Sequence, residues 1–599
     1  MAQKEIKKRS EVEKQYTWAT EDMFESDQAW FDAFEAAKAY PAEFASFRGR
    51  LCESADTFWS YLQLVDKMGL EISLLANYAM RKSDEDTSNS YYQDMRAKLM
   101  SLDVEIDSAS SFDVPEILAM PESRFEDFCK EKPELELYRR WYSKLVRRKE
   151  HILSDAEEKL LAGAGEMSNA PDHIGSVFRN ADLKFPDVID GEGNSHRLTQ
   201  GSYVPMLESS DRVLRKNAFE TLYATFGGFR NTAAALLDAQ VRQLSFFAKA
   251  RKYSNTLEAA LDRTEVPENV YHNLIEAVNA NLPKMHRYVE LRKKLMKLDT
   301  LHMYDVYTPV VDDADSEIPY EQAKTDVLEA LEVLGEEYVG LLKKGFSERW
   351  IDVYENEGKR SGAYSSGGRP HPYVLLNHKD TLDSEFTLAH EMGHALHSYY
   401  SIKNQPNIYS HYVIFVAEVA STCNEVLLMR HKLAKTTDKR EKAYLLNHFL
   451  EQFRGTLYRQ TMFAEFELTM NRMVESGQSL TADALCKEYY ELNRRYFGEG
   501  MEVDKQIEME WARIPHFFYN FYVFQYATGF SAAVAIANRI LAEGKPAVDD
   551  YLKFLSSGST ADPISLLKIA GVDMNTPEPV NKALELFEEL VDEMEQLLA

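Results

Sequence analysis

Residues 383–401 read DSEFTLAHEMGHALHSYYS, and the interpretation of the whole chain starts from this stretch. It contains no proline, and its apolar residues recur every three or four positions, as in an amphipathic helix. His390 and His394 are four residues apart, so a helix places their rings one above the other, where they can grip one metal ion. The sequence therefore predicts a helix that carries two metal-binding histidines on one face.

The residues around these histidines add chemistry and structure. Glu391 follows the first histidine, so its carboxylate can reach a water at an open coordination position. Asp383 or Ser384 can cap the start of the helix. Gly393 lowers helix stability by up to ~1 kcal/mol relative to alanine, which predicts that another element packs closely against it. Together these features indicate a zinc hydrolase that cleaves amide bonds.

A third metal ligand is required, because a catalytic zinc keeps three protein ligands and one open position. A histidine three residues beyond a glycine would complete the pattern HExxHxxGxxH, but His397 and Tyr400 occupy those two positions. The apolar stretch 412–430 instead carries Glu418, a carboxylate that is costly there unless it is paired or bound to a metal. A basic partner for Glu418 is the alternative.

Two further residues are expected to support the ligands. Glu425 lies two helical turns after Glu418 on the same face, where its carboxylate can accept a hydrogen bond from the second ring nitrogen of a ligand histidine. His397, three residues after His394, is placed in the same supporting layer.

Several stretches of the chain resemble one known family. They are HEMGHALHS (390–398), FVAEVASTCNE (415–425), GKRSGAYSSGGRPHPYVLLN (358–377), IPHFFYNFYVFQYATGFSAA (514–533) and WATEDMFESDQAWF (18–31). They are similar to the M3 metallopeptidases, and most of all to the bacterial oligoendopeptidase F branch. The resemblance covers nearly the whole chain, and the central and late motifs are its most specific parts.

The resemblance implies a fold and the roles of particular residues. It implies a mainly α-helical, two-lobed metallopeptidase with a deep substrate channel and a small β-sheet next to the HExxH helix. Residues 1–190 are expected to form an N-terminal helical lobe and residues 191–599 the catalytic domain. Within the site, the resemblance gives Glu418 the role of third ligand and Glu391 the role of base.

A helix is expected from about His516 to Ile540, with polar-tipped rings along one face. His516, Tyr519, Tyr522 and Tyr526 recur at spacings of three, three and four residues. Neutral donors of this kind can stabilise the oxyanion that forms when a peptide carbonyl is attacked. M3 enzymes use tyrosine and histidine residues from a similar segment, and the His-then-Tyr order matches His516, Tyr522 and Tyr526 best. Packing of aromatic rings within a helical lobe is the alternative.

Short strands are expected within residues 350–379, around a glycine-rich turn. An exposed strand edge can bind a peptide by adding it as another strand, whatever its side chains. We assign this role to residues 372–377, and an ordinary core hairpin is the alternative. The residues expected to bind substrate are Gly362, Tyr373, Val374, Leu375 and Leu376.

Composition limits the remaining possibilities. The apolar content of 45% and the charged content of 28% are those of a globular protein. The formal net charge of −28 argues against nucleic acid as a partner. The four cysteines show no paired spacing, and we find neither a secretory signal nor a run of 18 apolar residues. These features favour the cytoplasm and exclude a membrane partner.

The sequence thus predicts a zinc endopeptidase that hydrolyses internal bonds of short unfolded oligopeptides. One Zn²⁺ activates a water, Glu391 accepts its proton, and the same carboxyl then protonates the leaving amine. A helical zinc carboxypeptidase or dipeptidase is the first alternative, and it would need a charged clamp such as Arg369 or Arg513. A non-catalytic, zinc-containing protein that binds peptides is the second.

Overall fold

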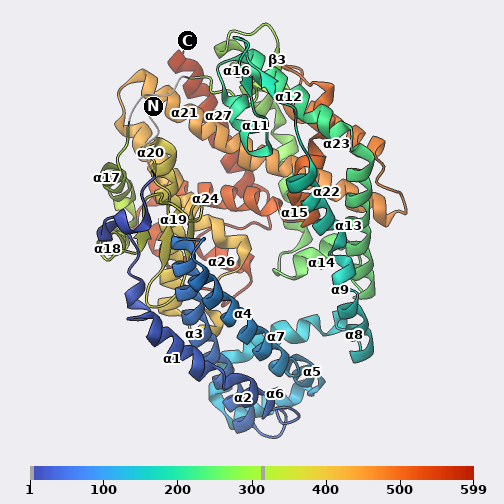
Figure 1. Cartoon of the computed structure of the whole chain (residues 1–599), viewed down its shortest axis with the longest axis vertical. Coiled ribbons are helices and arrows are strands. Elements are labelled where there is room, and N and C mark those ends of the chain that lie inside the picture. Colours follow the sequence, from blue (N-terminus) through green and yellow to red (C-terminus); the bar gives the residue numbers. More distant parts are fainter. Residues whose placement is uncertain (1–5, 312–316, 599) are drawn as a thin grey trace. The chain divides into compact units, whose positions relative to one another are not determined.

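The computed structural model describes residues 6–311 and 317–598, and helices dominate them (Figure 1). The sheets within this part of the chain are small, with two or three strands each. This confirms the expected mainly α-helical fold. No helix of the described residues has the length and apolarity needed to cross a bilayer.

The chain divides into two compact units that interleave along the sequence. The first unit combines residues 1–149, 316–428 and 536–571, and the second combines residues 150–315, 429–535 and 572–599. The chain therefore passes between the units five times. This arrangement differs from a single boundary at residue 190.

The first unit begins with seven helices. They are α1 (Asp27–Ala37), α2 (Tyr40–Ala45), α3 (Ala55–Glu85), α4 (Ser90–Ser110), α5 (Asp113–Ala119), α6 (Glu122–Glu131) and α7 (Arg139–Arg147). It continues with α17 (Tyr320–Ala330), α18 (Glu336–Ser347), α19 (Leu382–Asn404), α20 (Ile414–Lys435), α25 (Lys545–Leu555) and α26 (Pro563–Ile569). One apolar core joins the first seven helices to Tyr373 and Leu375 of the sheet.

The second unit is also built mainly of helices. They are α8 (Asp155–Gly163), α9 (Gly165–Ser168), α10 (Ala170–Val177), α11 (Gln200–Glu208), α12 (Arg212–Gly227), α13 (Arg230–Ala250), α14 (Thr256–Asp262), α15 (Glu268–Ala280), α16 (Leu282–Leu295), α21 (Lys439–Gln452), α22 (Arg459–Glu475), α23 (Ala482–Phe497), α24 (Phe524–Glu543) and α27 (Glu578–Leu598). It also holds a hairpin of β1 (Val188–Ile189) with β2 (Ser195–His196), and a parallel pair of β3 (Leu301–His302) with β7 (Met501–Glu502).

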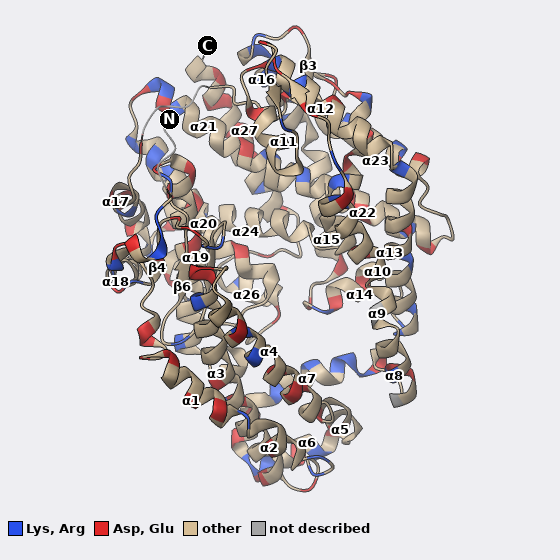
Figure 2. Cartoon of the chain, viewed as in Figure 1, with Lys and Arg blue, Asp and Glu red and all other residues tan. Residues whose placement is uncertain are grey.

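Charged residues are spread over most helices, with both signs interspersed (Figure 2). Individual helices depart from this mixture: α7 carries several basic residues, whereas α27 is strongly acidic along its length. The excess of negative charge is therefore distributed over many helix surfaces.

The sheet of the first unit contradicts one expectation. Its strands β4 (Ile351–Asp352), β5 (Tyr364–Ser366) and β6 (Tyr373–Leu375) lie in the order β4-β6-β5, so β6 is the central strand. It pairs with β4 in parallel and with β5 in antiparallel orientation, and both of its edges are occupied.

Residues 372–377 are therefore not an exposed edge, and the expectation that a peptide adds to this segment as another strand is wrong. Tyr373, Val374 and Leu375 are 0% exposed and Leu376 is 1% exposed. An uninterrupted apolar run is typical of a strand that is buried on both faces, and this strand has that pattern.

The predicted metal-binding helix is α19, and it starts slightly earlier than expected. Thr381 is its N-cap, and the Thr381 hydroxyl accepts a hydrogen bond from the backbone N–H of Ser384 at 3.3 Å. Asp383 and Ser384 therefore lie inside the first turn. The negative charges of Asp383 and Glu385 interact favourably there with the positive end of the helix dipole.

The expected helix from His516 to Ile540 is interrupted. A short 3₁₀ turn spans Pro515–Phe518, and α24 begins only at Phe524. Between them, Asn520 and Phe521 have φ values of 55° and 53°, in the left-handed region that ends a right-handed helix. Apolar spacing could not predict this break, because contacts with a distant helix hold it in place.

Candidate active site

Two neighbouring helices of the first unit bring the three predicted metal ligands together. His390 and His394 lie on α19, Glu418 lies on α20, and one ligand atom from each falls within 4.8 Å of the others. The Nε2 atoms of the two histidines are 3.1 Å apart, and they lie 3.4 and 3.5 Å from Oε2 of Glu418.

These separations fit a tetrahedral zinc. Ligand atoms about 2.0–2.2 Å from a tetrahedral ion lie about 3.3–3.6 Å from one another, close to the 3.1–3.5 Å found here. Two imidazole nitrogens and one carboxylate oxygen form the donor set of several catalytic zinc sites, with the fourth position left open. The donor atoms and their spacing therefore suit one zinc ion.

The helices α19 and α20 approach each other closely beside the second ligand. A Cβ atom at Gly393 would lie 2.6 Å from Cα of Ser421 and 2.7 Å from the carbonyl oxygen of Ala420. Asn424 of α20 also donates a hydrogen bond from Nδ2 to the carbonyl oxygen of Ala389, at 3.1 Å. The close packing predicted at Gly393 is therefore present, and it sets the distance between the two ligand-bearing helices.

Glu425 supports the first ligand from behind. Its Oε1 lies 2.5 Å from Nδ1 of His390, which leaves Nε2 of that ring for the metal. Burial lowers the pKa of His390, but the hydrogen bond that its ring donates to Glu425 and the negative charges of Glu425, Glu391 and Glu418 outweigh burial and raise the pKa to about 9. A carboxylate that fixes the ring and increases its basicity in this way strengthens a metal ligand.

Glu391 is buried beside the ligands. It is 7% exposed, and its Oε2 atom has no hydrogen-bond partner among the described residues. Burial raises the pKa of Glu391, although the positive charges of His390 and His394 oppose this. A buried carboxylate oxygen that makes no other hydrogen bond is suited to accept a proton from a water.

Glu418 remains a carboxylate because of its neighbours. Burial raises its pKa, but the hydrogen bond and charge of His394, together with His390 and the Ser421 hydroxyl, lower it to about 2. Ser421 donates to Oε2 of Glu418 at 3.2 Å and was not predicted from the sequence. Its position three residues after Glu418 on a helix is the signal that could have found it.

His397 is placed differently from the supporting role expected for it. It is 1% exposed, and its ring stacks on Tyr412 with a centroid distance of 3.7 Å and an interplanar angle of 3°. Burial, with a smaller contribution from His394, lowers its pKa to about 3, so the ring is neutral. Within the described part of the chain no hydrogen bond joins His397 to a ligand, and its contacts are those of packing.

The second unit brings the four predicted rings of residues 516–526 together, and we call them the ring cluster: His516, Tyr519, Tyr522 and Tyr526. The centroids of His516 and Tyr522 are 6.3 Å apart with the rings nearly parallel, and Tyr522 and Tyr526 are 5.6 Å apart edge to face. Tyr519 is 58% exposed, and burial lowers the pKa of His516. The interrupted helix still gathers these side chains.

The strand β5 contacts α19 and lies at the edge of its sheet. Among the described strands none pairs with its outer edge. Gly362 precedes β5 with a φ of 83°, a conformation that glycine adopts without strain, and Asn377 donates a hydrogen bond to its carbonyl oxygen at 2.8 Å. The unpaired edge next to the ligand helix thus belongs to β5 rather than to β6.

Comparison with known proteins agrees with this arrangement. A family model described as peptidase family M3 matches residues 205–586, and a model described as oligopeptidase F matches residues 116–185. Oligopeptidase PepF of Bacillus subtilis (strain 168) is 48% identical over 98% of this chain and 88% of its own length. Group B oligopeptidase PepB of Streptococcus agalactiae is 40% identical over 99% of this chain and 98% of its own. The crystal structure of oligoendopeptidase-F from Enterococcus faecium superimposes with a TM-score of 0.75 at 38% identity, covering 96% of this chain and 99% of that one.

Proposed function

Because the chain belongs to peptidase family M3 and is a metalloendopeptidase, we propose that it uses one Zn²⁺ to cleave internal bonds of short unfolded oligopeptides. The observation that carries the proposal is the convergence of His390, His394 and Glu418 on one point between two helices. Their donor atoms and spacing support zinc as the ion.

When bound, the zinc supplies a Lewis acid that polarises the peptide carbonyl and makes a water acidic near neutral pH. The chain's own residues hold the ion and handle the proton. Glu425 fixes the orientation of His390, and Ser421 does the same for Glu418 through a hydrogen bond to its carboxylate. These hydrogen bonds hold Nε2 of His390 and the carboxylate of Glu418 in the orientation that binding to one metal ion requires.

Glu391 is proposed as the general base and then the general acid. Its buried Oε2, which has no hydrogen-bond partner among the described residues, can accept the proton of the attacking water. The raised pKa brings the carboxyl closer to neutral pH, so the same group can afterwards deliver that proton to the leaving amine. His516, Tyr519, Tyr522 and Tyr526 are proposed as hydrogen-bond donors to the oxyanion, for which neutral donors are well suited.

The substrate backbone is proposed to pair with the outer edge of β5, which takes the place of β6 in this role. Main-chain pairing gives affinity for an extended peptide without selecting its side chains. Gly362, two residues before β5, allows the chain to turn tightly before the edge begins. The formal net charge of −28 favours peptides over nucleic acids as ligands. We also propose a cytoplasmic location, supported by four cysteines that form no disulfide.

Cleavage of peptides that are blocked at both ends tests this function. An N-acetylated and C-amidated peptide series of increasing length is incubated with the enzyme, with and without a chelator. We expect internal cleavage of the short members that stops when the chelator is added. Cleavage that requires a free terminus would instead indicate a carboxypeptidase or dipeptidase. Tight binding without cleavage would indicate a peptide-binding protein.

A further inference from the structure

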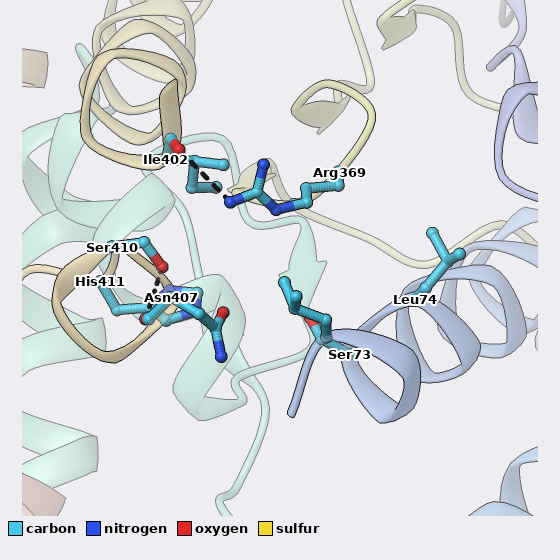
Figure 3. A pocket seen from close by; sticks show the side chains of 9 residues that line it. Ser73, Leu74, Arg369, Ile402, Asn407, Ser410 and His411 are labelled. Carbon is cyan, nitrogen blue, oxygen red and sulfur yellow. Dashed lines mark hydrogen bonds between the residues drawn. The ribbon is translucent and has the colours of Figure 1, made fainter. Parts of the chain in front are cut away.

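A small polar pocket lies in the first unit, beyond the end of the metal-binding helix. Its walls come from α3, from the loop after β5, from the end of α19 and from the segment that precedes α20 (Figure 3). The pocket has an empty volume of about 320 Å³, including the part that is open to solvent. The residues that the argument uses are Leu70, Ser73, Arg369, Ile402, Asn407 and His411.

Arg369 gives the pocket a positive charge, and no carboxylate of the described residues forms an ion pair with it. Arg369 is exposed. It donates one long hydrogen bond, of 3.4 Å, to the carbonyl oxygen of Ile402 (Figure 3). Burial, together with the charge of Arg369, lowers the pKa of His411, so that imidazole is a neutral hydrogen-bonding group. The chain has 97 acidic and 69 basic residues, so an arginine without an acidic partner among the described residues is unexpected. Such an arginine in a pocket is suited to bind an anionic ligand.

Close contacts join this pocket to the helix that carries the two proposed histidine ligands. Gly367, two residues before Arg369, packs so closely on Ser398 of α19 that an added Cβ would lie 2.6 Å from the Ser398 hydroxyl. That hydroxyl lies 3.0 Å from the hydroxyl of Tyr412, the residue next to His411. The pocket therefore shares α19 with the metal centre.

The helix also gives the spacing between the two sites. Ile402 lies eight residues after His394, which corresponds to about 12 Å along an α-helix. An extended peptide covers about 3.3–3.6 Å per residue, so three to four residues span this distance. The pocket is thus within reach of one end of a peptide whose central bond lies at the metal.

We propose that this pocket binds a carboxylate of the peptide substrate, three to four residues from the bond that is cleaved. The proposal deepens the peptidase function and rests on it. Arg369 binds the carboxylate, while the polar groups of Ser73, Asn407 and His411 surround it and Leu70 and Ile402 contact its aliphatic portion. The carboxylate belongs either to an Asp or Glu side chain or to the C-terminus.

Matched peptides distinguish the two sources of the carboxylate. One pair places Glu or Gln three or four residues on either side of the scissile bond, with both ends blocked. A second pair has Gln throughout and ends in either a free carboxylate or an amide. For the wild type we expect a KM about tenfold lower for the carboxylate member of one pair. The pair that shows the difference identifies the source.

Arg369→Gln should remove this preference, so that the carboxylate and the neutral member of each pair have the same KM. Lys403→Gln is the matched control, because it removes a neighbouring exposed charge that lies near Glu337 instead. Unequal binding of the paired peptides to Glu391→Gln tests the pocket even if no peptide is cleaved, so failure of the peptidase function is recognised separately. Equal KM and Kd values within every pair, or a preference that survives in Arg369→Gln, would overturn the proposal.

A second and independent feature is the strained turn that presents the ring cluster. Asn520 and Phe521 are consecutive non-glycine residues at positive φ, and for a bulky phenylalanine this conformation is unusual. Such strain persists only where surrounding contacts impose it, and it tends to occur at functional sites.

Helix α22 imposes this turn. Oε1 of Glu467 accepts a hydrogen bond from the backbone N–H of Phe521 at 3.2 Å. The side-chain amides of Asn471 and Asn520 donate to each other at 2.7 and 3.1 Å. The ring of Phe521 also lies edge to face with Tyr271, at a centroid distance of 5.5 Å.

The burial of the Glu467 side chain lowers the stability of the fold. Glu467 is 0% exposed, and its Oε2 has no hydrogen-bond partner within the described residues. Burial raises its pKa well above the usual value, which favours the neutral carboxylic acid over the carboxylate, although the hydrogen bond from Phe521 opposes this. A buried polar group of this kind costs stability, and its one hydrogen bond goes to the strained turn.

We also infer that Glu467 is a positioning residue that holds the ring cluster in its working arrangement. This rests on the proposed role of those rings as donors. Glu467→Gln keeps a neutral acceptor for Phe521 and should retain near-normal kcat. Glu467→Met removes the acceptor at similar volume, and it should lower kcat by at least tenfold with little change in KM.

Hydrogen exchange at the amides of residues 519–523 provides a readout that is independent of activity. It should accelerate in Glu467→Met and remain slow in Glu467→Gln. Tyr522→Phe with normal kcat would remove the ring role alone, and exchange would still test the effect of Glu467 on the turn. Unchanged exchange and kcat in folded Glu467→Met, or equal losses in both Glu467 variants, would overturn the inference.

Discussion

The α-carbon of Gly393 and the backbone of Ser421 are in direct contact, because a Cβ added to Gly393 would lie 2.6 Å from Cα of Ser421. This contact joins the helix that carries two of the proposed ligands to the helix that carries the third. The proposed metal site therefore depends on the missing side chain at Gly393 as well as on the three proposed ligands.

The first prediction concerns this contact. Gly393→Ala should force the backbones of α19 and α20 apart, since the atoms in the way are main-chain atoms. We expect lower metal affinity and a loss of about 1–3 kcal/mol in the free energy of unfolding. Titration with zinc and thermal unfolding measure the two effects.

Gly340→Ala is the control for this substitution. Gly340 lies on α18 with no atom within 4 Å of an added Cβ, so alanine there should stabilise the protein by up to ~1 kcal/mol. Equal behaviour of the two variants would contradict the proposed role of the helix contact.

The second prediction separates the base from the ligands. Glu391→Gln should keep its metal and lose at least a hundredfold in kcat, because the amide cannot accept the proton. His390→Ala and Glu418→Ala should instead lose the metal. Asp383→Asn, an exposed change in the first turn of the same helix, should leave both properties unaltered. Full turnover by metal-loaded Glu391→Gln would show that another group is the base.

The third prediction concerns the carboxylate behind the first ligand. Glu425→Gln removes the charge that holds Nδ1 of His390. We expect about 10–100-fold weaker binding of zinc, with the helices still folded. Competition with a chelator of known affinity measures the change. Unaltered zinc affinity in this variant would mean that Glu425 does not support the ligand.

The fourth prediction is a pH dependence of stability in the second unit. Burial raises the pKa of Glu451, but Arg454 and Arg292 outweigh it and lower that pKa to about 2. The folded state therefore binds the proton more weakly than the unfolded chain, where a glutamate titrates near 4.3. The resulting stabilisation is fully present above this value and is lost as the pH falls from about 4.3 to about 2.

Glu451→Gln tests this sign directly. The variant should unfold at lower temperature than the wild type at pH 7, and the difference should shrink as the pH approaches 2. Thermal unfolding at several pH values measures it, and Glu593→Gln, at a partly exposed ion pair with Lys442, is the control. A difference in melting temperature that stays constant with pH would contradict the assignment.

Much of the first unit's site could be predicted from the sequence, because local spacing determines it. The four-residue interval between His390 and His394 places both rings on one helix face. The apolar neighbours of Glu418 indicated that its carboxylate is paired or binds a metal. Gly393 also predicted a close contact between helices. Glycine has a low helix propensity, so its presence in the middle of a helix indicated a packing role. The stacking of His397 on Tyr412 was missed because it depends on how distant residues pack. Ser421 was missed although it lies three residues after Glu418 on the same helix.

The failures share one physical cause, which is pairing with distant parts of the chain. The edge of the sheet could not be identified because Val374 pairs with Ile351, and its register partner on the other side is Ser365. The helix expected after Pro515 breaks because Glu467, 54 residues before Phe521, accepts that residue's N–H. Local propensity favours a continuous helix, but the tertiary contact overrides it.

The most direct test of the metal-centred account is a stoichiometric titration. The enzyme is stripped of metal, zinc is added in steps, and cleavage of a peptide blocked at both ends is measured at each step, together with bound zinc by elemental analysis. The account predicts no cleavage at the start and a linear return of activity that ends at one ion per chain. Full activity in the stripped enzyme, or zinc bound to His390→Ala with activity intact, would contradict it.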